Sequence, residues 1–339
     1  MSKQKLFCFL YLIPVLVFSS ENSDALSIFQ GVTKAELHLH LGGAYPKEYL
    51  HTIATEQQKE DLDRSLTAVA QGIDYHDVFR VFQTVSQIVN SEEKVQKGVE
   101  ALCEHLQEDG ISYAELRTGL KNLGCGHEAY LTAVLQGIQE LASERFQVKV
   151  LLSLQRNSTI EMARQTVNLG LKYRNEGVVG IDLSGDATVG QVESIIPELL
   201  RAKNAGLAIV VHLGESKQEK DQLLLLEALH PQRIGHGVHL TQEAKEWILK
   251  HKTPIEICLT SSVITKMIEQ HADHPGLQFF RLEHPVAFCT DDPLIFSTTL
   301  SNEFLIAHEK TGLSIKEILQ ISQDAFKHRV VPFVRNTPG

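Results

Sequence analysis

The chain has 339 residues, of which 43% are hydrophobic and 22% are charged, so its composition is that of a globular protein and excludes a disordered one. The formal net charge of −10 offers no basic surface to nucleic acid or to anionic membranes, which favours a small neutral or weakly charged ligand. The five cysteines form no CxxC pair, so reduced thiols are the simpler interpretation. A monomer is compatible with the sequence, which does not specify the oligomeric state.

The N-terminus is basic and then apolar. Lys3 and Lys5 precede an apolar run over residues 6–18, and small and polar residues follow from Ser19. This pattern is typical of a signal peptide over residues 1–20 that is cleaved after Ser19, because the run is too short for a transmembrane helix. A secreted or periplasmic protein is therefore expected. A buried helix in a cytoplasmic protein is the alternative.

Apolar, β-rich runs alternate with helical patterns along the rest of the chain. The expected strands cover residues 35–41, 111–118, 148–154, 178–183, 208–213, 233–235, 255–259 and 286–289. The expected helices cover residues 92–108, 128–143, 159–176, 191–205, 218–229, 241–250 and 314–325. This alternation predicts parallel βαβ units, and eight of them favour a closed TIM (β/α)8 barrel. A doubly wound sheet is the alternative, but no GxGxxG turn follows the first strand.

The segment between the first two strands, about residues 45–110, is too long for a single crossover. It is expected to hold additional helices over the barrel mouth. Phe79 and Phe82 in this segment could form an apolar lid, and packing in the core is an equal alternative for helical aromatic residues.

Histidines mark the ends of three expected strands, where TIM barrels place their catalytic groups. His38 and His40 share one face of the first strand, and two inward imidazoles at this spacing favour a pair of metal ligands. A single histidine would more often be a structural residue of the core. His212 ends the fifth strand, and His236 ends the sixth between two glycines that allow close approach of the backbone.

Carboxylates accompany these histidines. Glu215 follows His212 by three residues, and Asp291 and Asp292 follow the eighth strand. Two adjacent aspartates would repel each other unless a cation or donor lies nearby, although a turn or a helix cap before Pro293 is an alternative. Three imidazoles with one carboxylate suit Zn2+ with an open position for water, whose pKa zinc lowers to about 7. Glu215 could then move protons, and His236 could orient the water.

Several of these segments resemble the signature motifs of the adenosine deaminase family. In order, the matching segments are residues 36–41, 113–117, 181–186, 212–215, 233–237, 256–262 and 290–293, followed by a similar tail from Asn302 to Phe326. The H-x-E and P-C-x-x-C signature of cytidine-type deaminases is absent. The resemblance covers nearly everything after residue 30, and it implies one adenosine deaminase-like barrel domain over residues 30–335.

The resemblance also implies a set of metal ligands and a reaction. The ligands to one zinc ion per chain would be His38, His40, His212 and Asp291, and His40 would also lie against the substrate. The reaction would convert adenosine or deoxyadenosine and water to the inosine product and ammonia, as in purine salvage, without a redox cofactor.

The remaining site residues receive roles from the same resemblance. Glu215 would protonate purine N1 while activated water attacks C6, and His236 would assist the water. Asp292 would form a hydrogen bond with N7, and the backbone at Gly185 would lie near N3.

One position departs from the family pattern. Gly42 stands where adenosine deaminases carry an aspartate that binds the ribose 5′ region. Loss of a hydrogen bond to a charged partner costs about 1.5–3 kcal/mol. Adenosine could therefore bind more weakly, with Tyr45 or a lid residue compensating, or the substrate could be a 5′-modified adenosine such as an aminofutalosine-like nucleoside. Glycine could also be neutral there if other residues contact the ribose.

Two rival interpretations remain. A binuclear amidohydrolase often uses a bridging lysine at the fourth strand, and the segment from Asp182 to Gly185 contains none. A secreted, non-catalytic binding or signalling protein on the same fold is the second rival, but the other expected site positions are intact.

Overall fold

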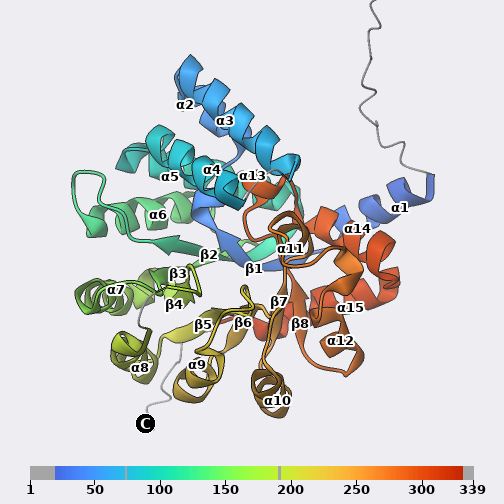
Figure 1. The fold of residues 1–339 in the computed structure, drawn as a ribbon. Coiled ribbons are helices and arrows are strands. Elements are labelled where there is room, and N and C mark those ends of the chain that lie inside the picture. Colours follow the sequence, from blue (N-terminus) through green and yellow to red (C-terminus); the bar gives the residue numbers. More distant parts are fainter. Residues whose placement is uncertain (1–19, 73–74, 190–191, 331–339) are drawn as a thin grey trace, which may run out of the picture.

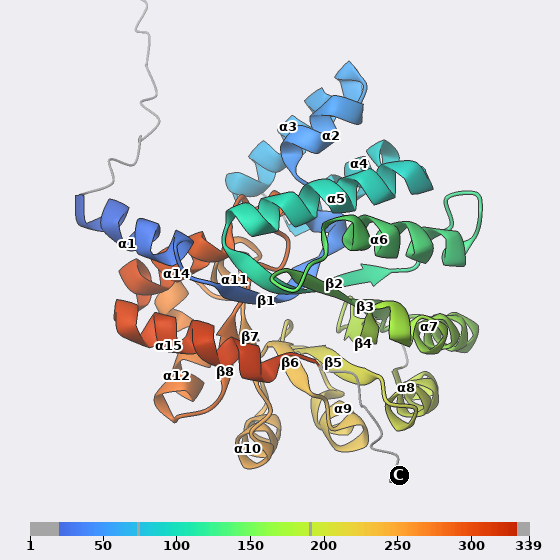
Figure 2. The same ribbon diagram turned by 180° about the vertical axis from the view of Figure 1, so that it is seen from behind.

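The computed structural model describes residues 20–72, 75–189 and 192–330. Eight parallel strands follow one another around a barrel in chain order, as the alternating pattern predicts, and helices surround them (Figures 1 and 2). The strands are β1 (Lys34–His40), β2 (Ile111–Gly119), β3 (Gln147–Gln155), β4 (Val178–Ser184), β5 (Ala208–Leu213), β6 (Arg233–His236), β7 (Ile255–Ile257) and β8 (Val286–Phe288).

The barrel closes through the residue that follows β8 by three positions. Asp291 forms an isolated parallel bridge with Leu39 of β1. The His40 amide donates to the Asp291 carbonyl at 2.9 Å, and the Asp291 amide donates to the His38 carbonyl at 2.9 Å. The seam of the barrel therefore passes between residues that the sequence assigns to the metal site.

Helices on the outside bury the strands, which explains why every residue of β4 and β5 is buried. The helices that follow β2 to β8 are α6 (His127–Leu141), α7 (Ile160–Lys172), α8 (Ile196–Asn204), α9 (Gln222–Leu229), α10 (Gln242–His251), α12 (Gly276–Arg281), α14 (Leu300–Thr311) and α15 (Ile315–Ala325). Thr159, Thr241, Thr299 and Ser314 begin four of them, because each hydroxyl accepts a hydrogen bond from a backbone amide three residues later.

The long segment between β1 and β2 forms helices, as expected. They are α2 (Lys47–Ile53), α3 (Glu56–Ala70), α4 (Tyr75–Ile88) and α5 (Glu92–Glu108). Figure 1 shows them together at the top of the view, on one side of the barrel. Before β1, α1 (Ser20–Gln30) packs on α14, with the rings of Phe29 and Phe304 centred 5.8 Å apart.

Short helices occupy several connections. They are α11 (Leu259–Ile264) and α13 (Pro293–Phe296), with the single turns η1 (Leu41–Gly43), η2 (Arg174–Glu176), η3 (Val192–Ser194), η4 (His271–Asp273) and η5 (Phe326–His328). The strand expected over residues 255–259 ends early because α11 begins at Leu259. The buried carboxylate of Glu303 accepts the amides of Leu259 and Thr260 at that helix start.

The expected signal peptide lies outside the described residues except for Ser20, the first residue of α1. Among the described residues, no helix is long and apolar enough to cross a membrane.

Candidate metal and substrate site

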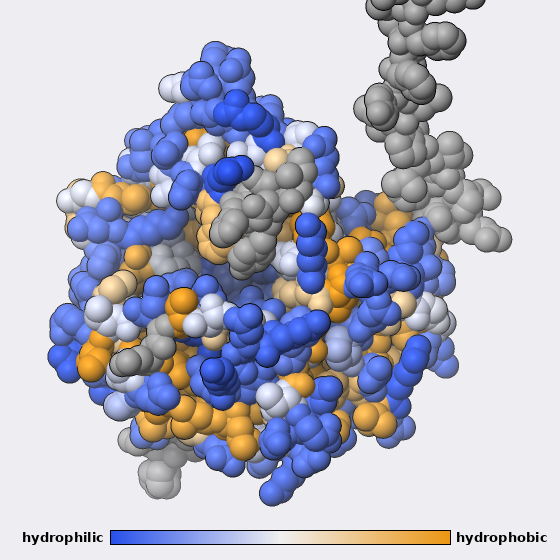
Figure 3. Space-filling model, viewed as in Figure 1, coloured by the Kyte–Doolittle hydropathy of each residue, from blue (hydrophilic) through white to orange (hydrophobic). Residues whose placement is uncertain are grey.

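A cavity of about 810 Å³ opens at the carboxyl ends of the strands. Residues at or just after the carboxyl ends of all eight strands line it, as expected for a TIM barrel site. The space-filling view shows a hollow near the centre of this largely hydrophilic face (Figure 3). All of the expected site residues except His38 line the cavity, and His38 is fully buried directly beneath it.

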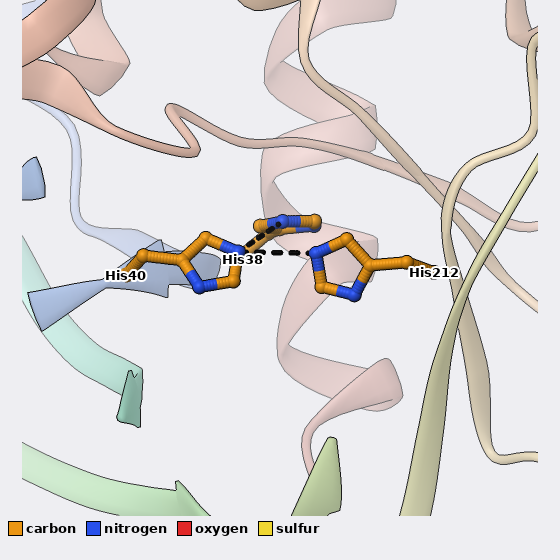
Figure 4. A group of neighbouring side chains, drawn as sticks. All are labelled: His38, His40 and His212. Atoms are coloured by element: carbon orange, nitrogen blue, oxygen red, sulfur yellow. Dashed lines mark hydrogen bonds between the residues drawn. The ribbon is translucent and has the colours of Figure 1, made fainter. Parts of the chain in front are cut away.

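Three imidazoles meet at the bottom of the cavity. The Nε2 atoms of His38 and His40 lie 3.1 Å apart, and those of His40 and His212 lie 3.0 Å apart. Figure 4 shows the rings of His40 and His212 facing each other with His38 behind and between them, and dashed lines join the His40 nitrogen to the other two. Gly235 of β6 makes room for this arrangement, because a β-carbon there would lie 2.9 Å from His38 Cε1.

Carboxylates hold the opposite ring nitrogens of two of these histidines. His38 Nδ1 lies 2.8 Å from Glu256 Oε2, and His212 Nδ1 lies 3.0 Å from Asp182 Oδ1. A carboxylate at Nδ1 keeps the proton there, so the Nε2 lone pairs face the shared centre. Lone pairs at this separation repel unless a cation lies between them, so the donor set fits a metal ion.

Asp291 supplies the fourth donor group. Its Oδ1 atom lies 3.4 Å from His38 Nε2 and 3.5 Å from His40 Nε2, and its Oδ2 atom accepts a hydrogen bond from Ser261 Oγ at 2.5 Å. The backbone of Asp291 has φ of 67°, a left-handed conformation that non-glycine residues rarely adopt and that is concentrated at functional sites. The structure therefore brings all four expected ligands together.

The thiol of Cys258 also lies close enough to His38 and Asp291 to count as a donor. Burial raises the pKa of this thiol well above its ordinary value, so it is protonated in the absence of a metal. Three imidazoles and the Asp291 carboxylate therefore form the better donor set.

Glu215 and His236 lie beside the imidazole cluster. His236 Nε2 is 3.6 Å from Glu215 Oε1, and His236 has a left-handed backbone with φ of 63°. Burial lowers the pKa of His236 well below its usual value, which keeps the ring neutral. Withdrawal from water raises the pKa of Glu215. A neutral base and a carboxyl group that retains its proton more readily thus stand at one wall of the cavity.

Two glycines give the remaining expected residues their positions. A β-carbon at Gly43 would lie 2.0 Å from Asp292 Oδ1, so this glycine lets the Asp292 side chain pack on the backbone after β1. Gly185 has φ of 92°, and a β-carbon there would lie 2.2 Å from Gln155 Oε1. Asp292 Oδ1 is buried and has no hydrogen-bond partner among the described residues. Asp292 itself lines the cavity.

Comparison with known proteins places this site in a family. The family model described as adenosine deaminase matches residues 33–337. The chain belongs to the adenosine deaminase family, whose members are hydrolytic deaminases.

Individual proteins of known activity or structure are also similar to this chain. The N6-methyl-AMP deaminase of Danio rerio is 32% identical over 92% of this chain and 94% of its own length. The crystal structure of the N6-methyl-AMP deaminase from Arabidopsis thaliana, without ligand, superimposes with a TM-score of 0.82 at 31% identity, covering 91% of this chain and 95% of the other. The arabidopsis protein ADAL, solved in complex with IMP, gives a TM-score of 0.81 at 30% identity, covering 90% and 94%.

The deaminase also contains a buried ionic network that the strand-end argument missed. Arg117 donates to Asp182 at 3.1 Å and to Glu256 at 2.6 Å, so one guanidinium joins the two carboxylates that orient His212 and His38. Arg233 donates to Glu256 at 2.7 Å from β6. The sequence signal for this network was the presence of charged residues in the middle of apolar strand runs, because charged residues are seldom buried without a partner.

A second network holds the turn that carries Glu215. Arg156 donates to the His212 carbonyl at 2.8 Å and to Glu219 at 2.5 Å, and Glu219 accepts the Gly214 amide at 2.5 Å. These contacts fix the backbone at His212 and Gly214, immediately before the expected proton donor. Arg156 and Glu219 carry no sequence motif that predicts this role in the deaminase.

Aromatic residues of α4 form one wall of the cavity. Phe79 and Phe82 both line it, and the side chain of Phe79 is 46% exposed. Phe82 approaches Gly42, since a β-carbon on Gly42 would lie 3.3 Å from Phe82 Cδ1. The structure thus places both phenylalanines at the mouth of the deaminase.

Proposed function

We propose that this deaminase hydrolyses the C6 amine of a purine nucleoside 5′-monophosphate, with N6-methyl-AMP as the first candidate, and uses one zinc ion per chain. The observation that carries the proposal is the convergence of three imidazole Nε2 atoms beside Glu215 and His236 in one cavity. The names of the relatives support the nucleotide, since they act on N6-methyl-AMP and one is solved with IMP.

Four side chains would hold the metal: His38, His40, His212 and Asp291. Burial and the neighbouring imidazoles of His212 and His38 lower the pKa of His40 to about 3, so this ligand is neutral at physiological pH, as metal binding requires. When bound, zinc would lower the pKa of a water molecule so that it can act as a nucleophile near neutral pH.

Glu215 and His236 would carry out the proton transfers of the reaction. A Glu215 carboxyl with a raised pKa carries the proton that purine N1 needs when C6 becomes tetrahedral. His236, kept neutral by burial, can accept a proton from the attacking water. The two groups lie 3.6 Å apart, beyond direct hydrogen-bond distance, so the proton taken from water would pass between them through a bridging water molecule.

Asp292 would recognise the purine ring. Burial, with the neighbouring Asp291 charge, raises the pKa of Asp292 well above its ordinary value, so its carboxyl group keeps a proton. A protonated carboxyl can donate a hydrogen bond, and purine N7 is an acceptor. Because Asp292 lines the cavity, its carboxyl group would be the donor to N7.

A panel of substrates tests the proposal. Purified protein should release methylamine from N6-methyl-AMP, and should act less well on AMP, adenosine and N6-methyladenosine. Metal analysis should find one zinc ion per chain, and removal of the ion by a chelator should abolish turnover until zinc is restored. Zinc-loaded protein that deaminates none of these compounds would contradict the proposal. A ratio near two zinc ions per chain would favour a binuclear hydrolase instead.

Two expectations stay predictions. Adenosine is the second candidate substrate, and a higher kcat/KM for adenosine than for N6-methyl-AMP would reverse our order. Export through the leader is proposed on the sequence alone. Mass spectrometry of the mature N-terminus would reveal cleavage near Ser19.

A further inference from the structure

A lysine stands on the wall of the cavity away from the metal centre. Lys121 lines the cavity and follows the end of β2 by two residues. Because His40 of β1 pairs with Arg117 of β2 in parallel register, Gly42 and Lys121 follow neighbouring strands into the same part of the mouth. The position that lacks a side chain and the lysine thus both line the cavity, after neighbouring strands.

The ammonium group of Lys121 has no partner among the residues that the structure describes. It makes no hydrogen bond and no ion pair with any residue in the described ranges 20–72, 75–189 and 192–330, although its side chain is partly buried. The other arginine or lysine lining the cavity, Arg117, is engaged by Asp182 and Glu256 beneath it. Lys121 is thus the available cation of the described cavity wall.

Burial lowers the pKa of Lys121, and no carboxylate offsets that effect. The carboxylate of Asp186, which also lines the cavity, accepts hydrogen bonds from the amide and hydroxyl of Thr188 at 2.8 and 2.6 Å. An uncompensated ammonium group in a partly buried place is unfavourable, and an anionic ligand would relieve it.

The loop after β2 presents Lys121 in a defined place. The side-chain oxygen of Asn122 accepts the amides of Gly124 and Gly126 at 3.0 and 3.1 Å, which ties the loop to itself. A lysine on such a loop loses less freedom on binding than one on an open chain.

We propose that Lys121 binds the 5′-phosphate of the substrate and makes the enzyme select a nucleoside monophosphate over the free nucleoside. This assignment rests on the proposed deaminase function. Gly42 complements it, because glycine puts no carboxylate at the position where the family pattern has an aspartate. The ligand class is therefore a purine carrying a dianionic group on its 5′ side.

The test compares Lys121→Met with Lys121→Arg and with the control Lys217→Met. Lys217 is exposed near the mouth, on the turn after Glu215, but does not line the cavity. In Lys121→Met, kcat/KM for N6-methyl-AMP should fall about 10- to 100-fold, chiefly through KM, as expected for loss of a charged hydrogen bond. Turnover of N6-methyladenosine should change less than about twofold. Lys121→Arg should retain most of the preference, and Lys217→Met should resemble the wild type.

Equal losses on nucleotide and nucleoside, or no loss on either, would overturn the assignment. If the wild type deaminates neither compound, the proposed function fails, and calorimetry with IMP, inosine and inorganic phosphate then decides the role of Lys121. Tighter binding of IMP than of inosine that is lost in Lys121→Met supports it. The assignment is contradicted if Lys121→Met binds IMP as tightly as the wild type does. It is also contradicted if inorganic phosphate binds as tightly as IMP.

Discussion

Glu215 has both the position and the raised pKa that a proton donor to the substrate needs. It lies 3.6 Å from His236, outside the set of metal donors, and withdrawal from water raises its pKa. Glu215→Gln should therefore keep the metal and lose about 10²- to 10⁴-fold in kcat, because the amide cannot supply the proton. Steady-state kinetics and metal analysis of the same preparation check this. Near-normal kcat at full metal content would remove Glu215 from the mechanism.

Gly42 is the residue at which the sequence departs from its family, and it offers a second test. In Gly42→Asp the new carboxylate should repel a 5′-phosphate, and Phe82 must shift by a few tenths of an ångström to admit the side chain. We expect kcat/KM to fall about 10-fold or more for N6-methyl-AMP and to rise for adenosine. Gly42→Asn is the control, because its side chain has nearly the same size as that of aspartate and carries no charge. Equal behaviour of the two variants would assign the effect to crowding.

The metal donors could be predicted from sequence because their pattern is local. His38 and His40 alternate on one strand, and strand ends of parallel barrels meet at one face. Lys121 and Arg156 could not be predicted this way. Lysine after a strand is usual for a solvated loop, and the contacts of Arg156 join residues more than 50 positions away.

At the scale of the elements, β4 contributes to the metal site without reaching the metal. Its Asp182 lies 3.0 Å from His212 Nδ1, and His212, together with Arg117, keeps the pKa of Asp182 low despite burial. Asp182→Asn should weaken metal affinity about 10- to 100-fold by loosening the orientation of that imidazole. Competition with a chromophoric chelator measures the affinity. Asp186→Asn, on the loop after β4, should leave it unchanged, and an equal loss in both variants would count against the orienting role.

The fold was predictable because each strand and its crossover helix are encoded within a few tens of residues. All eight expected strands are present, and α5 has the expected bounds. The errors fall at boundaries. The helix expected from residue 191 gives an α-helix only from Ile196, with a proline in its first turn, and α9 begins at Gln222 rather than at 218. The short helix α11 depends on Glu303, which is far away in sequence, so no local pattern could reveal it.

For the whole molecule, buried neutral histidines predict a loss of stability in acid. Burial lowers the pKa of His274 to about 3, and its Nδ1 accepts the Gly276 amide at 3.0 Å. An unfolded histidine titrates near 6.5, so below that pH the unfolded state binds more protons than the native state, and stability falls as the pH drops from 6.5 toward 3. Each such group contributes up to about 1.4 kcal/mol per pH unit.

Urea unfolding between pH 7.5 and 5, with a chelator present so that metal loss does not contribute, measures this slope. His274→Asn retains an acceptor for the Gly276 amide but cannot titrate, so its free energy of unfolding should decline less steeply with acid than that of the wild type. Parallel slopes for the two proteins would show that His274 does not titrate as proposed.

The seam between β1 and the end of β8 has a consequence for the order in which the metal donors become available during synthesis. Its two backbone hydrogen bonds join residues about 250 positions apart, and the same residues belong to the candidate metal donors. A ribosome delivers His38 and His40 early and Asp291 only near the end of synthesis. A nascent chain therefore carries imidazoles that can bind a metal loosely long before the barrel can close around it. The ion is held by its full set of ligands only in a chain that is almost finished.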